Sequence, residues 1–195
     1  MLKQVKTSRE SFIEHALASQ NMDIQKVGAE VKAGQRGLRD GSFYSIVDAS
    51  GLRTIKMFET QDDEETGIKN IAKARLEKGE IFLPDQIILL AATSTATTYD
   101  ATAIAKLTFG SIGEIEGLSN GEFEMRSNKN KIIIPSFSNH VFVTEHALIK
   151  GCYSITNPQI IEDDVEIDFT IETKVAVPAK TAIKLILLGT VTVPS

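Results

Sequence analysis

The clearest pattern in this sequence is a strict alternation of apolar and polar side chains near its C-terminal end. Val165–Glu172 reads Val-Glu-Ile-Asp-Phe-Thr-Ile-Glu, with an apolar residue at every second position. Successive side chains of a β-strand point to opposite faces, so the pattern predicts a strand with one buried and one wet face. We expect Ile167, Phe169 and Ile171 to point into a core. A second long strand, Ala182–Val193, is predicted to be its antiparallel neighbour.

The second strand is apolar on both of its faces over its middle. Ile183, Leu185 and Leu187 share one face, and Ile186 and Leu188 share the other. A strand of this kind needs cover on both sides, because an exposed apolar face is unfavourable in water. We therefore expect either a helix of this chain or another subunit to lie on the second face.

From residue 80 onward the sequence predicts a series of short strands and no helix. The connections between these segments are rich in Gly, Asn, Pro and Asp, which favour turns. Short strands at spacings of roughly ten residues are typical of a β-sandwich or barrel. The predicted strands are Glu80–Leu83, Gln86–Thr93, Ala103–Phe109, Gly121–Arg126, Lys131–Ile134, His140–Thr144, Leu148–Ile155, Ile160–Ile161, Val165–Val175 and Ala182–Val193.

The N-terminal region predicts two short amphipathic helices. Thr7 and Glu10 have capping-box spacing before a helix over residues 8–19, and Asp23 can cap a second helix that ends before Gly34. Two helices this short do not bury their apolar faces unaided, so we expect them to dock on a partner or to stay mobile. Residues 1–41 are predicted to form a helical arm and flexible junction, and residues 42–195 the β-sandwich domain.

Between the arm and the strands, the sequence predicts a hairpin and one inserted helix. Phe43–Val47 and Leu52–Phe58 are predicted to pair across a turn at Ser50 and Gly51. Residues 64–78 carry apolar side chains at helical spacing after an acidic start, and Gly79 follows at a C-cap position. This segment gives the clearest helical pattern of the chain.

Composition and charge narrow the class of protein. The chain has 195 residues, 42% hydrophobic and 24% charged, which fits one folded domain, and its net charge of −5 argues against a generally basic nucleic-acid binder. Residues 1–56 are mildly basic and the rest acidic. Cys152 is the only cysteine, so no intrachain disulfide forms, and we expect a packed thiol. No apolar run is long enough to span a bilayer, and we expect no membrane insertion.

The sequence predicts no catalytic, cofactor-binding or metal-binding residue. His140, Glu145 and His146 are the only conceivable metal set, and they lack the H-x-H spacing of cupins. The dense acidic segment Glu162–Asp168 lacks a Gly-punctuated calcium loop, so we expect it to face solvent or an interface. The hydroxyl-rich segment Ala91–Ile104 has no His and Asp arrangement that would activate a nucleophile, and it is expected to form a loop or contact surface.

With these features the sequence resembles single jelly-roll viral capsid proteins, most closely those of tailless icosahedral bacteriophages. The resemblance covers residues 80–195. It is carried by Leu118–Arg126 followed by Lys131–Pro135, by Asn157–Ile161 leading into Val165–Glu172, and by the closing strand Ile183–Val193 with its Gly-Thr pair. Major capsid proteins of many such phages contain two jelly rolls, whereas this chain has the length for one.

The resemblance implies a mainly β, jelly-roll-like antiparallel β-sandwich, and a non-enzymatic virion structural protein of the shell or vertex. It implies self-assembly through the sandwich and the N-terminal arm, with other virion proteins as partners and with genome or membrane contact by the arm. Such a protein is made in the host cytoplasm and takes no cofactor or small-molecule substrate. A cupin-like metal- or sugar-binding jelly roll, and a phage decoration or receptor-binding protein, remain alternative interpretations.

Overall fold

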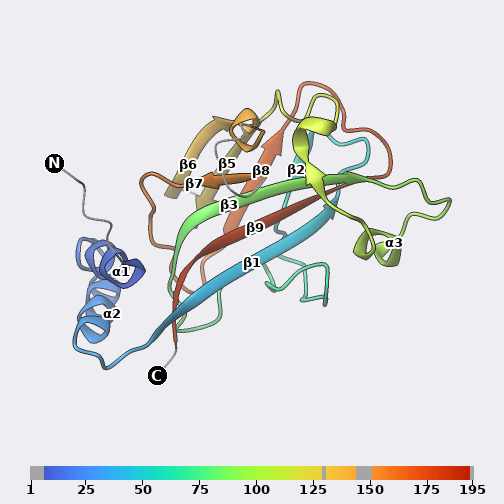
Figure 1. Ribbon diagram of the computed structural model, residues 1–195. Coiled ribbons are helices and arrows are strands. Elements are labelled where there is room, and N and C mark those ends of the chain that lie inside the picture. Colours follow the sequence, from blue (N-terminus) through green and yellow to red (C-terminus); the bar gives the residue numbers. More distant parts are fainter. Residues whose placement is uncertain (1–6, 129–130, 144–150, 194–195) are drawn as a thin grey trace.

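The computed structural model describes residues 7–128, 131–143 and 151–193, and within these the chain is a β-sandwich of two antiparallel sheets with a few helices (Figure 1). The mainly β class is confirmed. The strands are β1 (Leu38–Asp48), β2 (Thr54–Lys56), β3 (Phe82–Thr93), β4 (Gly110–Ser111), β5 (Glu122–Ser127), β6 (Lys131–Ser138), β7 (Cys152–Ser154), β8 (Ile167–Glu172) and β9 (Thr181–Thr192). The helices are α1 (Ser8–Leu17), α2 (Met22–Lys32) and α3 (Ala101–Ala105), with 3-10 turns η1 (Ile112–Glu114) and η2 (Asn139–Phe142).

The order of the strands is that of a jelly roll. One sheet, here called the β9 sheet, runs β1-β9-β3, with β7 and β4 both on the far edge of β3; the other, the β8 sheet, runs β2-β8-β5-β6. Apart from the short β4, strands pair from the two ends of the chain inward: β1 with β9, β2 with β8, β3 with β7 and β5 with β6. This is the pairing of one long hairpin rolled into two sheets, as in jelly rolls.

The core lies between the two sheets and is rich in aromatic side chains. Ile167, Phe169 and Ile171 are fully buried, as their alternation predicts. The Phe169 ring stacks on Phe123 with centroids 5.5 Å apart and an interplanar angle of 12°, and Phe142 approaches Phe123 at 5.0 Å. Side chains of both sheets therefore fill the interior of the sandwich.

Two predicted strand pairings are wrong. β8 and β9 lie in different sheets, because β8 pairs with β2 and β5 whereas β9 pairs with β1 and β3. The segment Thr173–Lys180 carries the chain from one sheet to the other instead of forming a hairpin turn. The segments predicted as the hairpin Phe43–Val47 and Leu52–Phe58 likewise belong to β1 and to the region of β2, on opposite sheets. Alternation identifies a strand, but it does not identify the neighbour.

The helix predicted over residues 64–78 is absent. The segment is a series of turns, and Lys73 and Ala74 have φ values of 53° and 54°, in the left-handed region that ends a right-handed helix. Its apolar residues are buried in two places. Ile68 belongs to a small apolar cluster with Ile46, Ile104 and Ala182, whereas Ile71 and Leu76 join the main core. The helical spacing therefore arises from residues that are buried in two separate clusters.

This turn segment covers the free edge of β1. Ile46 donates its backbone N–H to the Ile68 carbonyl at 2.8 Å. The Asn70 carboxamide accepts from the Tyr44 N–H at 2.6 Å and donates to the Ser42 carbonyl at 2.7 Å, as a neighbouring strand would. Covering an edge strand prevents unwanted pairing with other chains.

Other predicted strands also differ from the structure or lie partly outside the described residues. Ala103–Phe109 is α3 and a loop, because Asp100 caps the helix by accepting from the Ala103 N–H at 2.8 Å. The segment predicted from His140 begins with the η2 turn, and residues 144 and 148–150 lie outside the described residues. The two segments around Pro84 form one strand, β3, with a register shift between Pro84 and Gln86.

The N-terminal helices form as predicted but dock on their own chain. Thr7 and Glu10 make the capping box of α1, and Asn21, not Asp23, caps α2. β1 begins at Leu38, inside the range expected as a flexible junction. In Figure 1 the pair lies beside one end of the sandwich. The helices bury their apolar faces in one cluster with that end: Phe12, Ala16, Ile24, Val27 and Val31 with Ile81, Leu83 and Ile160.

Candidate functional site

The outer face of the β9 sheet carries apolar side chains in register on adjacent strands. The register aligns Tyr44 with Ile186, Ile186 with Ile88, and Ile88 with Cys152. In the next row Ser42 aligns with Leu188. The name outer stripe is used below for the partly or mostly buried apolar residues in the middle of this face: Tyr44, Ile88, Leu90, Ile186 and Leu188.

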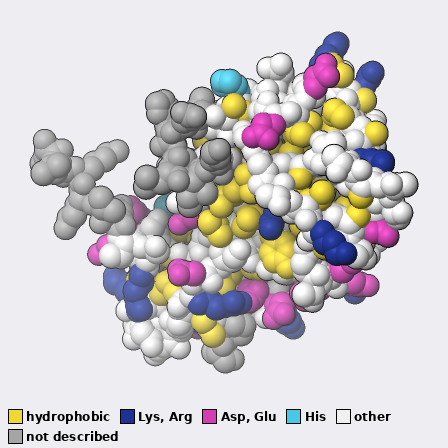
Figure 2. Space-filling model, turned by 45° about the vertical axis from the view of Figure 1, so that its right-hand side comes forward, with side chains coloured by type: hydrophobic (Ala, Val, Ile, Leu, Met, Phe, Trp, Pro, Cys, Tyr) yellow, Lys and Arg dark blue, Asp and Glu magenta, His cyan; other side chains and the backbone are white. Residues whose placement is uncertain are grey.

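Among the residues that the structure describes, helical cover reaches the two ends of this face but not the outer stripe. At one end α1 and α2 pack over Leu83. At the other end Ile46 and Ala182 lie in a small cluster with Ile104 of α3. None of the outer-stripe residues belongs to either cluster. We expected the second face of the last strand to be covered, and helices do cover the two ends of this face. In its middle, Ile186 and Leu188 stay partly exposed in the described chain. Figure 2 shows hydrophobic side chains reaching the surface between charged ones.

Opposite charges stand at the two ends of the outer stripe. The Lys184 ammonium lies 5.8 Å from the centre of the Tyr44 ring and 5.7 Å from that of Phe109. Such cation–π contacts hold the ammonium over the sheet. At the other end Asp40 aligns with Thr190, and Asp85 sits at the register shift of β3. Among the described residues, none of Lys184, Asp40 and Asp85 is in an ion pair.

The environment of the acidic end shifts two pKa values upward. Partial burial raises the pKa of Asp85, a backbone hydrogen bond partly offsets this, and the nearby Asp40 carboxylate raises it further. Burial, and then the charge of Asp85, raises the pKa of the Cys152 thiol. A thiol with a raised pKa is a poor nucleophile, in line with the packed cysteine expected from the sequence.

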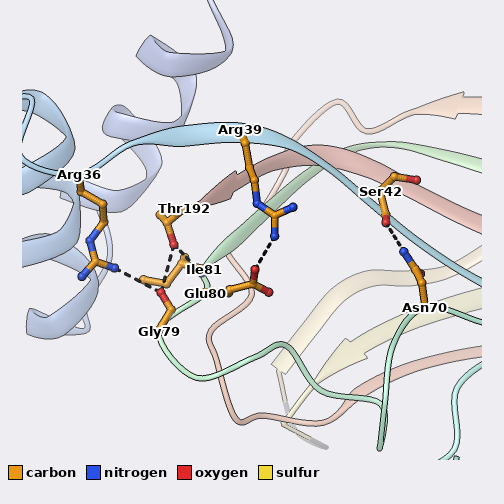
Figure 3. A network of polar contacts seen from close by, with 8 residues as sticks. All are labelled: Arg36, Arg39, Ser42, Asn70, Gly79, Glu80, Ile81 and Thr192. Carbon is orange, nitrogen blue, oxygen red and sulfur yellow. Dashed lines mark hydrogen bonds and ion pairs between the residues drawn. The ribbon is translucent and has the colours of Figure 1, made fainter. Parts of the chain in front are cut away.

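A polar network ties the start of β1 to the start of β3 and the end of β9 (Figure 3). Arg39 is paired with Glu80 at 2.6 Å, and Arg36 donates to the Gly79 carbonyl at 3.3 Å. Thr192 accepts from the Ile81 N–H at 2.9 Å and donates to the Gly79 carbonyl at 3.3 Å. These bonds fix the strand ends on which the helix pair rests.

A polar pocket of about 480 Å³ lies beside this network, between β1 and the turn segment. Arg39 and Arg75 line it, and they are paired with Glu80 and Asp164 respectively. These cations are therefore neutralised within the chain.

Three carboxylates of the acidic segment Glu162–Asp168 bind groups in distant parts of the chain. Asn21 donates to Glu162 at 3.0 Å, and the Gly79 N–H donates to Asp163 at 2.7 Å. Arg75 pairs with Asp164 at 3.0 Å. Glu162 and Asp163 are partly buried against distant parts of the chain and so differ from the expected edge, whereas the Asp164 side chain is 81% exposed and faces solvent as expected.

The structure describes only part of the conceivable metal set His140, Glu145 and His146. His140 is exposed on η2, and Glu145 and His146 lie outside the described residues. Across residues 7–128, 131–143 and 151–193 no group of three or more His, Cys, Asp or Glu side chains is placed to hold a metal ion. In the same ranges no helix is long and apolar enough to cross a membrane. The hydroxyl-rich segment forms the end of β3, a loop and the start of α3.

Comparison with models of known protein families and with curated proteins finds no match to this chain. The jelly-roll fold, its filled interior and the outer stripe are therefore the features from which a function follows.

Proposed function

We propose that this protein is a non-enzymatic virion structural protein that assembles, through its jelly roll, into a capsid shell or its vertices. Jelly rolls are the building blocks of many viral shells and also of lectins and cupins. A fold alone does not assign a function, so the choice among these rests on where this chain places its chemistry.

The observation that carries the proposal is the contrast between the inside and the outside of the sandwich. The interior is filled by buried side chains such as Phe123, Phe142 and Phe169, which argues against a ligand held between the two sheets. On the outside of the β9 sheet, by contrast, Tyr44, Leu90, Ile186 and Leu188 stay partly exposed in the part of the chain that the structure describes. Self-assembling proteins need such self-complementary surface.

The helix pair supports the same role. Its inner side is docked on the sandwich, and its outer side presents Leu17 and Met22, whose exposed fractions are 41% and 80%. Exposed apolar side chains on a docked helix pair offer a contact to neighbouring virion proteins. In this proposal the arm is a fixed part of the subunit that meets its neighbours, and the assembled protein resides in the virion.

The test is the assembly state of the purified protein and its place in particles from its source. Mass measurement and negative-stain electron microscopy are expected to show closed or ring-like assemblies, and a particle reconstruction is expected to place the jelly roll in the shell. A monomer at high concentration together with absence from such particles would contradict the proposal. Stoichiometric metal that is lost in both His140→Ala and His146→Ala would favour a cupin-like protein instead.

A further inference from the structure

We propose that the outer stripe is a two-fold interface between two copies of this chain, with Lys184 of each copy placed against Asp40 and Asp85 of the other. This inference rests on the proposed self-assembling function and names the surface and the partner. It follows from the spacing of apolar and charged residues along β9.

The residues of the outer face along β9 are arranged symmetrically about a point between Ile186 and Leu188. Lys184 precedes Ile186 by two residues, and Thr190 follows Leu188 by two residues. At about 3.4 Å per residue, Lys184 and Thr190 are separated by about 20 Å along the strand. A two-fold axis above the midpoint of β9, parallel to the sheet and perpendicular to the strand, packs the two outer faces together and places Ile186 of one copy on Leu188 of the other and Lys184 next to Thr190.

The same operation brings unlike charges together. Thr190 aligns with Asp40 on β1, and Asp85 follows Pro84, which aligns with Gly189 on β9. Both carboxylates are exposed in the single chain. The two-fold pairing thus sets two acids against each Lys184. It also relieves the repulsion between Asp40 and Asp85 that contributes to the raised pKa of Asp85.

The opposite face of the sandwich lacks this arrangement. The outward positions of the β8 sheet include Glu122, Glu124, Asp168 and Glu172, with Arg126 paired to Glu124 at 2.6 Å. Ile132 is a large apolar residue of this sheet, with an exposed fraction of 48%. An acidic face repels its own copy, whereas an apolar stripe with a cation at one end and acids at the other is complementary to itself.

The first experiment measures self-association by sedimentation velocity over a range of concentrations. Leu188→Glu is expected to raise the dissociation constant of the dimer by about a hundredfold, because it puts a carboxylate at the centre of an apolar contact. Ile132→Glu makes the matched change on the other sheet and is expected to leave association unchanged. Thermal unfolding of both variants is expected to stay cooperative, since Leu188 is partly exposed and Ile132 is exposed. A monomeric parent, or a Leu188→Glu variant that associates like the parent, would overturn the inference.

The second experiment swaps the charges. Lys184→Glu faces Asp40 and Asp85 in its own dimer, and the double variant Asp40→Lys, Asp85→Lys faces Lys184, so each alone is expected to associate at least about tenfold more weakly. Mixed in equal amounts, the two are expected to recover association, because every contact is then between unlike charges. Lys174→Glu, in an exposed loop, is the control. Failure of the mixture to associate more tightly than either variant alone would overturn the charge pairing.

These measurements separate this inference from the proposed function. Particle assembly that is unchanged in Leu188→Glu would contradict the two-fold interface and leave a shell role standing. A dimer that responds to both experiments but is absent from virions would support the interface and contradict the shell role.

Discussion

Arg39 and Glu80 form an ion pair in which one partner reaches solvent and the other does not. The Arg39 Nη2 atom lies 2.6 Å from Glu80 Oε1, and the side chains are 56% and 5% exposed. The pair joins the first strand to the residues that enter β3. The pair contributes to stability because Glu80 is buried, and a buried carboxylate without a partner destabilises the folded state.

The first prediction follows from this asymmetry. Arg39→Ala is expected to lower the free energy of unfolding by about 2 kcal/mol, because it leaves the Glu80 carboxylate buried without its cation. Chemical denaturation at pH 7 measures the change. The double variant Arg39→Ala, Glu80→Gln is expected to recover part of the loss, since a neutral amide is less costly to bury. Equal stability of Arg39→Ala and the parent would show that water already satisfies Glu80.

Local patterns in the sequence predicted the strands well and their partners poorly. The alternation around Phe169 and the doubly apolar run around Ile186 both correspond to strands, because burial on one or both faces is written into consecutive residues. The placement of these strands in different sheets depends on pairing with β1 and β2, which lie more than a hundred residues away. Nothing in a local pattern encodes such a partner.

The predicted inserted helix failed for a related reason. Ile68, Ile71 and Leu76 follow a helical period, yet Ile68 is buried in a small cluster apart from the main core, which Ile71 and Leu76 join. The left-handed residues Lys73 and Ala74 carry no sequence signal such as Gly or Asn. The two apolar faces of the last strand predict part of the outer stripe. They do not predict its acidic end, because Asp40 and Asp85 lie on other strands.

The second prediction concerns the close approach of β3 and β9. A Cβ atom on Gly189 would lie 2.1 Å from the Leu83 carbonyl oxygen, which is backbone and has little room to move. Gly189→Ala is therefore expected to lower the free energy of unfolding by roughly 1 to 3 kcal/mol. Gly37→Ala is the control, because its Cβ would meet Val193 at an ordinary 3.6 Å. If both variants unfold at the same denaturant concentration, the two strands are not this close.

The third prediction tests the two faces of β8. Phe169 is fully buried and stacked on Phe123, so Phe169→Ala is expected to cost roughly 3 to 5 kcal/mol through lost burial and a cavity. Asp168 is partly exposed on the other face and accepts from the Thr170 hydroxyl at 2.8 Å. Asp168→Ala is expected to change stability by no more than about 0.5 kcal/mol. Denaturant unfolding compares the two, and similar effects would contradict the register of β8.

The fourth prediction concerns the helix pair, which buries its apolar face in a cluster separate from the main core. Removal of residues 1–33 exposes Ile81, Leu83 and Ile160 and breaks the bond between Asn21 and Glu162. The main core is untouched, so the shortened chain is expected to unfold cooperatively, at a midpoint lower by roughly 10 °C. Calorimetry measures this, and binding of a hydrophobic dye is expected to increase.

Two point variants of the full chain test whether the drop in midpoint comes from the docked face of the helix pair. Phe12→Ala, at a fully buried position, is expected to reproduce part of the drop in midpoint, whereas Met22→Ala, at an 80% exposed position, is expected to leave it unchanged. Loss of the cooperative transition on deletion would show that the helices and the sandwich fold as one unit. Because the deletion spares the outer stripe, the shortened protein is also expected to keep the dimer contact, so the arm and the sheet face act as separate surfaces.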